Sequence, residues 1–348
     1  MKKLSALLLT LSMFAGFSAC GESTSESSDS SSETSTSESS VNESSEDSEN
    51  SSESESSSED ENSDAEDEEN YETGDASLDN PRNQDDIGEN ELLVISFGTS
   101  YNDSRRLNIG AIENDIEKAF PEFSVRRGFT SNIIIDHINS RDGILIDDVE
   151  AALKRSVDNG VKNLVVQPTH LMNGLEYADL AEAIAQYSDA FEKVAIGEPL
   201  LTSDEDFAKV EAALVAQTEK YDDGKTAICF MGHGTTADSN EIYSKLQTLF
   251  DADGYENYCI GTVEAKPDID DVITKVKAGE YERVVIQPLM VVAGDHANND
   301  MAGDEDSWKT ALEAEGYEVE CVLQGLGEDE AIRQIYVEHA QAAVDSIK

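Results

Sequence analysis

The chain has 348 residues, of which 75 are acidic and 24 are basic, so its formal net charge is −51 at neutral pH. A chain this acidic is a poor partner for nucleic acid, because phosphate backbones attract basic surfaces. The charge is not confined to one end, since residues 91–348 still hold about 50 acidic residues against 21 basic ones. In chain order, the sequence divides into a short apolar leader, an acidic polar segment and a long globular region.

Residues 1–20 have the pattern of a secretory signal peptide. Lys2 and Lys3 precede an apolar run over residues 4–17, and small residues stand directly before Cys20. A cysteine at this place resembles the bacterial lipoprotein signal, which implies lipidation of Cys20 and a membrane-anchored protein facing outside the cytoplasm. Ordinary secretion with a free Cys20, or an uncleaved anchor, are the alternatives, although the run is short for a membrane-spanning helix.

Residues 21–90 are mostly Ser, Glu, Asp, Asn and Thr, with about 25 acidic residues against a single basic one, Arg82. A segment with so few apolar residues cannot bury enough surface to fold. We therefore predict a disordered, acidic tether over residues 21–90. Capture of cations by the tether is one interpretation, and a plain solvated spacer is the favoured one.

Residues 91–348 alternate short apolar runs with helical patterns, which predicts parallel sheets covered by helices on both faces. Cys229, Cys259 and Cys321 form no CxxC motif and are interpreted as small core residues. Strands are predicted at 92–96, 123–127, 163–167, 194–196, 227–231, 258–260, 283–292 and 319–323. Helices are predicted at 104–120, 143–159, 175–187, 204–220, 240–250, 269–278, 304–315 and 328–346.

The two halves of this region repeat each other, which predicts an internal duplication. The run Ile95-Ser-Phe-Gly-Thr-Ser100 aligns with Met231-Gly-His-Gly-Thr-Thr236, and Val166-Gln-Pro168 aligns with Ile286-Gln-Pro288. Two related α/β lobes are therefore expected over residues 91–222 and 223–348. In this register, Phe97 corresponds to His233, Ser131 to Glu264, and Glu176 to His296.

Three possible metal ligands, His233, Glu264 and His296, each follow an apolar run of the second half. Ligands bind beyond the carboxyl ends of parallel strands, so we expect these side chains to converge there. Two imidazoles and a carboxylate suit a divalent ion such as Fe, Co, Ni or Zn. A lone His is often structural, but the duplicated register favours a functional site. His170 is a secondary candidate, and Asp295 either orients an imidazole or caps the following helix.

Two other classes of site fit less well. The segment Ser96-Phe-Gly-Thr-Ser100 joins a strand to a helix, but it has neither the Lys of a phosphate-binding loop nor the Gly-x-Gly-x-x-Gly spacing. The chain also lacks the Gly-x-Ser-x-Gly elbow of a serine hydrolase. We therefore reject nucleotide binding and do not favour a hydrolase.

Several stretches together resemble the anaerobic cobalt chelatase family, the class II chelatases that insert Co²⁺ into sirohydrochlorin. The similarity runs in order through residues 92–347, covers the globular region and none of the tether, and implies two flavodoxin-like lobes with a cleft between them. The stretches are Ser96-Phe-Gly-Thr-Ser100, Asn173-Gly-Leu-Glu-Tyr177, Phe230-Met-Gly-His-Gly234, Val263-Glu264, Leu289-Met-Val-Val-Ala-Gly-Asp-His-Ala-Asn-Asn-Asp-Met301, Asp306-Ser-Trp308 and Gly325-Leu-Gly327.

The resemblance implies a sirohydrochlorin cobaltochelatase of cobalamin biosynthesis, with Fe²⁺ or Ni²⁺ as alternative metals, a precorrin-2-type tetrapyrrole as an alternative substrate, and no organic cofactor. Metal binding then falls on His233, Glu264 and His296, and both imidazoles can accept pyrrole protons. Glu176 would accept protons or position the macrocycle from the other lobe. The nearest plausible donors to the carboxylates of the macrocycle are Ser96, Thr99, Ser100, Arg105 and Arg106.

The expected export of this chain conflicts with the cytoplasmic location of cobalamin synthesis. An alternative function follows: a metal- or tetrapyrrole-binding protein outside the cytoplasm that keeps the chelatase fold without turnover.

Overall fold

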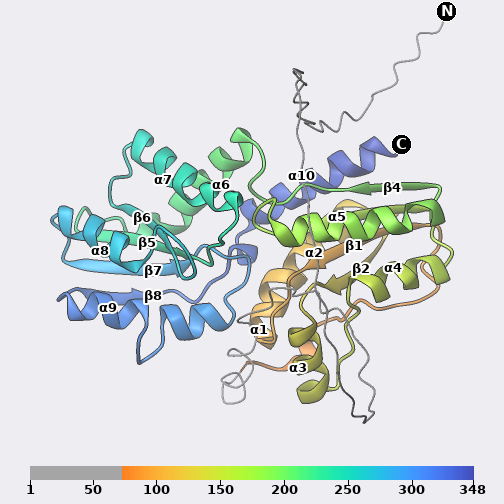
Figure 1. Ribbon diagram of the computed structural model, residues 1–348, viewed down its shortest axis with the longest axis horizontal. Coiled ribbons are helices and arrows are strands. Elements are labelled where there is room, and N and C mark those ends of the chain that lie inside the picture. The colour runs from red at the N-terminus through yellow and green to blue at the C-terminus, as the bar shows by residue number, and fades with distance from the viewer. Residues whose placement is uncertain (1–72) are drawn as a thin grey trace, which may run out of the picture. The chain divides into compact units, whose positions relative to one another are not determined.

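The computed structural model describes residues 73–348, which form two four-stranded parallel sheets flanked by helices (Figure 1). The predicted signal peptide, Cys20 and residues 21–72 of the tether lie outside the described residues. The first sheet has the order β2-β1-β3-β4, with β1 (Asn90–Ser96), β2 (Ser124–Phe129), β3 (Asn163–Pro168) and β4 (Lys193–Ile196). The second has the order β6-β5-β7-β8, with β5 (Thr226–Gly232), β6 (Tyr258–Thr262), β7 (Arg283–Pro288) and β8 (Glu318–Cys321).

The identical strand order in the two sheets confirms the predicted duplicated α/β fold. The central strands show why continuous apolar runs predicted strands in this sequence. Leu92, Leu93, Val94 and Ile95 of β1 are all fully buried. Helices cover both faces of a parallel sheet, so its strands are continuous apolar runs rather than alternating ones. Within residues 73–348, no helix is both long and apolar enough to cross a membrane.

The helices follow the prediction except between β1 and β3. The predicted helix 104–120 is divided by a π-helical turn at Arg105–Ile109, and the predicted helix 143–159 begins only at Val149. A helix that the sequence analysis missed is capped by Ser131 and ends at Gly143, whose φ is +68°. The helices are α1 (Asn102–Ser104), α2 (Gly110–Ala119), α3 (Asn132–Asp142), α4 (Val149–Asp158), α5 (Leu175–Tyr187), α6 (Asp204–Thr218), α7 (Glu241–Asp253), α8 (Ile269–Ala278), α9 (Trp308–Ala314) and α10 (Glu330–Ser346).

The last helix belongs to the second half of the sequence but packs on the first lobe, where it contacts α2, β3 and β4 (Figure 1). The Tyr336 hydroxyl donates to the Thr169 carbonyl at 2.8 Å, and the Arg333 guanidinium pairs with Asp115 at 2.6 Å. The division into lobes at residue 222 therefore does not hold for α10. The sequence could not reveal this crossing, because an apolar helix face does not specify which sheet it covers.

Residues 73–89, which we call the N-terminal strap, are folded against the first lobe and correct the predicted extent of the tether. Asp79 of the strap pairs with Arg105 at 2.7 Å and with Arg127 at 2.6 Å. Arg82 pairs with Glu113 at 3.2 Å, and all five of these charged side chains are almost fully buried. The low apolar content of these residues predicted disorder, but buried ion pairs, together with the packing of Ile87 on the core, hold the strap in place.

Candidate active site

The loops after β5 and β6 meet beside the end of the second sheet. The Glu264 amide donates to the His233 carbonyl at 2.8 Å, which ties the two loops together. Gly234, between them, has a φ of +90°, and a Cβ there would stand 2.8 Å from the Thr262 hydroxyl oxygen and 2.9 Å from the Ala265 amide nitrogen. Only glycine satisfies both the backbone conformation and this close approach.

The structure brings His233 and His296 into direct contact. Their ring centroids are 4.7 Å apart and their planes cross at 83°. The His233 Nδ1 lies 2.8 Å from the Gly234 carbonyl oxygen, and the His296 Nδ1 lies 2.8 Å from the Asp300 carboxylate. Each Nδ1 therefore carries the proton that its oxygen accepts, and Nε2 is the ring nitrogen suited to a metal ion.

Glu264 does not join these rings in the structure. Its residue is exposed, on the loop that follows β6. Among residues 73–348, no three His, Cys, Asp or Glu side chains lie close enough together to hold a metal ion. The predicted convergence is therefore seen for the two imidazoles only. The backbone of Glu264 is bonded to that of His233, and an exposed Glu side chain has the rotatable bonds to turn toward the imidazoles.

Asp300 is a site residue that the sequence analysis missed. It lies four residues after His296 and contacts it directly, whereas Asp295 accepts a hydrogen bond from the Asn299 side chain at 2.7 Å. The signal was the i, i+4 spacing, which places two residues on one face of a helix. Residues Ala297–Met301 form a π-helical turn, a feature that is frequent at functional sites.

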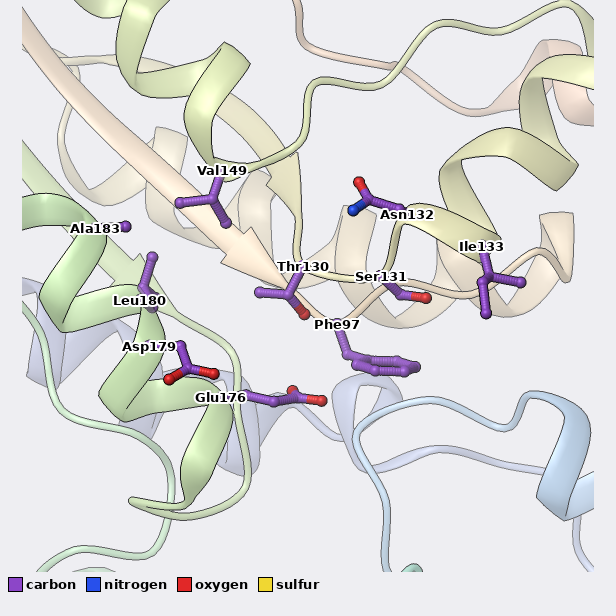
Figure 2. Close-up of a pocket in the computed structure, with 10 residues that line it drawn as sticks. All are labelled: Phe97, Thr130, Ser131, Asn132, Ile133, Val149, Glu176, Asp179, Leu180 and Ala183. Carbon is purple, nitrogen blue, oxygen red and sulfur yellow. The ribbon is translucent and has the colours of Figure 1, made fainter. Parts of the chain in front are cut away.

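A cavity of about 430 Å³ in the first lobe contains all three residues that the duplication aligns with the proposed ligands (Figure 2). Phe97, Ser131 and Glu176 line it together, as the register of the two halves predicts. Figure 2 shows Phe97 and Glu176 directed into the same space, with Asp179 one turn further along α5. The Phe97 side chain is 47% exposed, which is unusual for a large aromatic ring.

Glu176 has a histidine beside it. The His170 Nε2 lies 3.1 Å from a Glu176 carboxylate oxygen, although the angles do not meet hydrogen-bond criteria. The His170 side chain is 8% exposed and that of Glu176 is 47% exposed. His170, the secondary candidate, is therefore positioned to support the carboxylate and is not placed with the other two imidazoles by any contact in the structure.

Most of the residues predicted to donate hydrogen bonds to the macrocycle are buried, and several already bond to other parts of the protein. Ser96, Thr99 and Ser100 are buried, and the Ser96 hydroxyl accepts a hydrogen bond from Thr169 at 2.7 Å. Arg105 is fully buried, and its guanidinium is used by Asp79, by the Asn102 side chain and by the Thr99 and Ser100 carbonyls. The interpretation of Arg105 as a surface donor is therefore wrong, because its partner Asp79 lies in the segment that was expected to be disordered.

Arg106, the last of these donors, is the accessible one. Its side chain is 35% exposed and pairs with the exposed Asp103 at 3.0 Å. An exposed pair of this kind contributes little to stability. Replacing Asp103 by a carboxylate of a ligand as the partner of Arg106 therefore costs little free energy.

The buried Tyr243 packs against the loop that carries His233. The Gly234 amide donates to the Tyr243 hydroxyl at 3.3 Å. Burial raises the pKa of Tyr243 to about 12, so the phenol stays neutral at the working pH. A Cβ at Gly232 would stand 2.2 Å from the Tyr243 ring, which explains the glycine that precedes His233.

Comparison with known proteins identifies the family. Residues 90–345 match the family described as Cobalt chelatase (CbiK). This chain belongs to that family, and it is a metal chelatase. The sirohydrochlorin cobaltochelatase of Salmonella typhimurium is 37% identical over 261 residues, which are 73% of this chain and 96% of the relative. The sirohydrochlorin cobaltochelatase CbiKC of Nitratidesulfovibrio vulgaris is 31% identical over 260 residues, which are 74% of this chain and 91% of the relative.

Solved structures support the chelatase fold. SirB from Bacillus subtilis with Fe³⁺ aligns with a TM-score of 0.53 at 12% sequence identity, over 74% of this chain and 97% of SirB. SirB from Bacillus subtilis subspecies spizizenii in complex with cobalt aligns with a TM-score of 0.50 at 12% identity, over 74% of this chain and 96% of the other. At this identity the likeness concerns the fold alone.

Proposed function

We propose that this chelatase inserts Co²⁺ into sirohydrochlorin, as the names of its relatives indicate for those proteins. The observation that carries the proposal is the pair of contacting imidazoles, His233 and His296, each with Nδ1 bonded to an oxygen. In both rings Nε2 is then the nitrogen left for a metal ion, at the carboxyl end of one sheet. Cobalt is here the substrate and no organic cofactor is part of the proposal.

The reaction exchanges one divalent ion for two protons. Two pyrrole nitrogens each lose a proton and form a bond to the metal, while the bonds between metal and protein break. Few ligands favour this release, and imidazole serves well because it can bind metal when neutral and accept a proton afterwards. We assign His233 and His296 both roles and Glu264 the role of anionic ligand, after rotation of its exposed side chain.

Glu176 is assigned the first lobe's part in the reaction. It lines the cavity with Phe97, and its partly exposed carboxylate can accept a pyrrole proton. His170, at 3.1 Å, can hold it in place. Phe97 offers the macrocycle a flat apolar surface. The macrocycle carries eight carboxylates, so its polar edge is better placed at Arg106 than at Glu176 and Asp179.

The visible absorption of sirohydrochlorin, followed with purified full-length chain and Co²⁺ without oxygen, tests the proposal. We expect the spectrum to convert to that of the metallated product faster than with Co²⁺ alone. Equal rates with and without the protein would contradict the assignment. Protein that binds both substrates but gives no acceleration would instead be a metal- or tetrapyrrole-binding scavenger.

The same assay can measure which metal and which tetrapyrrole the protein prefers. Imidazole and carboxylate ligands also suit Fe²⁺ and Ni²⁺. We propose Co²⁺ as the preferred metal and sirohydrochlorin rather than a precorrin-2-type compound as the preferred macrocycle. Ratios of kcat/KM for the three metals and the two macrocycles measure these preferences, and a higher value for Fe²⁺ or Ni²⁺ would reassign the metal.

We also propose that the protein is exported and anchored by a lipid on Cys20. The signal-like residues 1–20 support this proposal. In cells fed a palmitate analogue, we expect label on the wild-type chain and none on Cys20→Ala, which should also leave the membrane fraction. An unlabelled wild-type chain would contradict the anchor without bearing on the chelatase activity.

A further inference from the structure

The N-terminal strap precedes residues 90–345, which match the chelatase family, and nothing in the proposed chemistry uses it. Its residue Asp79 is nevertheless buried among charges. One Asp79 oxygen lies 2.7 Å from the Arg105 Nε and 2.6 Å from an Arg127 nitrogen, and its other oxygen lies 3.1 Å from Arg127. Only 3% of the Asp79 side chain is exposed, and its two arginine partners hold the carboxylate in one position.

Asp79 is connected through Arg105 to the loop that begins at Phe97. Arg105, held by Asp79, donates to the Thr99 carbonyl at 3.2 Å and to the Ser100 carbonyl at 3.4 Å. Arg141 also donates to the Ser100 carbonyl, at 2.6 Å, so the contact to Thr99 is the one that Arg105 provides without Arg141. The same loop places Phe97 in the first-lobe cavity.

The loop also touches the second lobe beside a proposed ligand. A Cβ built on Gly294 would stand 3.0 Å from the Thr99 hydroxyl oxygen, so the loop packs directly against the backbone that leads to His296. The start of the strap reinforces this arrangement, because the Thr73 carbonyl accepts a hydrogen bond from the Asp103 amide at 2.7 Å. Thr73 also lines a pocket of about 150 Å³ together with Ala293 of the second lobe.

We propose that Asp79 is a positioning residue for chelation, which acts through Arg105 on residues 97–101 and so fixes the loop that carries Phe97 against the backbone before His296. The inference rests on the proposed chelatase function. Misplacement of reacting groups by about 1 Å can reduce turnover by about a hundredfold, so a fixed loop matters for a reaction between two lobes. The strap thereby contributes to the site although none of its residues is a proposed ligand or proton acceptor.

The test compares Asp79→Asn with the wild-type full-length chain under conditions where both are folded. We expect kcat to fall about tenfold while the affinity for Co²⁺ stays within about twofold, because the three proposed ligands lie on the second lobe. Amide hydrogen exchange of the peptide covering residues 97–105 should become faster. Asp79→Glu keeps the carboxylate and should recover part of the lost kcat.

Two controls separate positioning from stability. Asp85→Asn removes a carboxylate of the same strap that pairs with Arg155 at the surface, and it should leave kcat unchanged. Arg82→Gln removes the buried pair with Glu113, and the side-chain partners of Arg82 are Glu113, Glu117 and Asn114 rather than residues 97–101. It should therefore lower the melting temperature without a tenfold loss of kcat.

The possible outcomes are distinct. Wild-type protein without turnover would overturn the proposed function. Amide hydrogen exchange of residues 97–105 would then still measure whether Asp79 holds the loop. Active wild type together with wild-type kcat and loop exchange in Asp79→Asn would overturn the role of Asp79. An equal loss of kcat in Arg82→Gln and Asp79→Asn at equal loss of melting temperature would also overturn it, because stability alone would then explain the effect.

Discussion

The two lobes share one strand order but differ in what stands at the strand ends. The second lobe places His233 and His296 in contact, whereas the first places Phe97 and Glu176 around a cavity of about 430 Å³. Since the backbone arrangement is duplicated, the difference in chemistry comes from a few side chains. The proposed metal site therefore lies on the lobe with the two imidazoles, and the proposed macrocycle site on the lobe with the aromatic ring and the carboxylate.

The lobes also differ in buried charge. The first lobe, with its strap, buries charged side chains that form ion pairs: Arg82, Glu91, Arg105, Glu113, Arg126 and Arg127. Within residues 223–348, the buried polar side chains are neutral: Thr226, Thr262, Gln287 and Ser307. Buried ion pairs make the first lobe sensitive to loss of a single partner, because the remaining charge is left without compensation.

The largest effect is expected from removal of either imidazole. His233→Ala and His296→Ala should each weaken Co²⁺ binding at least about tenfold and reduce turnover about a thousandfold, because each ring is proposed as both ligand and proton acceptor. Titration calorimetry and the chelation assay measure the two effects. His137→Ala on α3 is the control and should bind Co²⁺ normally. Wild-type affinity in both variants would move the metal site away from the second lobe.

The next effect separates the roles of the lobes. Glu176→Gln keeps the size of the side chain and removes the charge, so turnover should fall about a hundredfold with Co²⁺ affinity nearly unchanged. Glu182→Gln, on the exposed side of the same helix, is the matched control. If Glu176→Gln weakens Co²⁺ binding as strongly as it slows turnover, the division between a metal lobe and a macrocycle lobe is wrong.

A smaller effect is expected from the aromatic surface. Phe97→Ala should raise the KM for sirohydrochlorin about tenfold, equivalent to about 1.4 kcal/mol of binding, and leave Co²⁺ affinity unchanged. Leu145→Ala removes another exposed apolar side chain of the first lobe and should change neither value. An unchanged KM in Phe97→Ala would show that the macrocycle binds elsewhere.

The smallest effect concerns acid stability of the first lobe. Burial opposes ionisation of Asp79, but hydrogen bonds and charges from Arg127 and Arg105 outweigh it and hold its pKa below the usual range. Its stabilisation is therefore complete above the unfolded pKa of about 3.9 and is lost as the pH falls through the folded value. Denaturant unfolding should show Asp79→Asn about 3 kcal/mol less stable than wild type at pH 6, with a smaller difference near pH 3.

The matched control for this measurement lies in the second lobe. Glu282→Gln removes an exposed pair with Lys225 and should change the unfolding free energy by less than about 0.5 kcal/mol at either pH. A difference between Asp79→Asn and wild type that is the same at both pH values would mean that folding does not lower the pKa of Asp79.

The sequence by itself determined the architecture. Strands buried on both faces must be continuous apolar runs, so runs such as 92–96 and 227–231 could be recognised without a structure. The repeat of short motifs predicted the duplication, and it correctly aligned Phe97, Ser131 and Glu176 as one set. His233 and His296 were also found this way, because the ends of neighbouring parallel strands lie at one edge of a sheet.

Only the tertiary structure decided which polar groups are available. Arg105 and Asp79 are ordinary surface residues by composition, and their mutual burial depends on a contact between segments that are separate in the sequence. Likewise, the i, i+4 partner of His296 could not be separated from the adjacent Asp295 until the π-helical turn was seen. Hydrophobic period is a local property of the chain, whereas the pairing of buried charges depends on the packing of distant segments, and so the sequence alone could not resolve it.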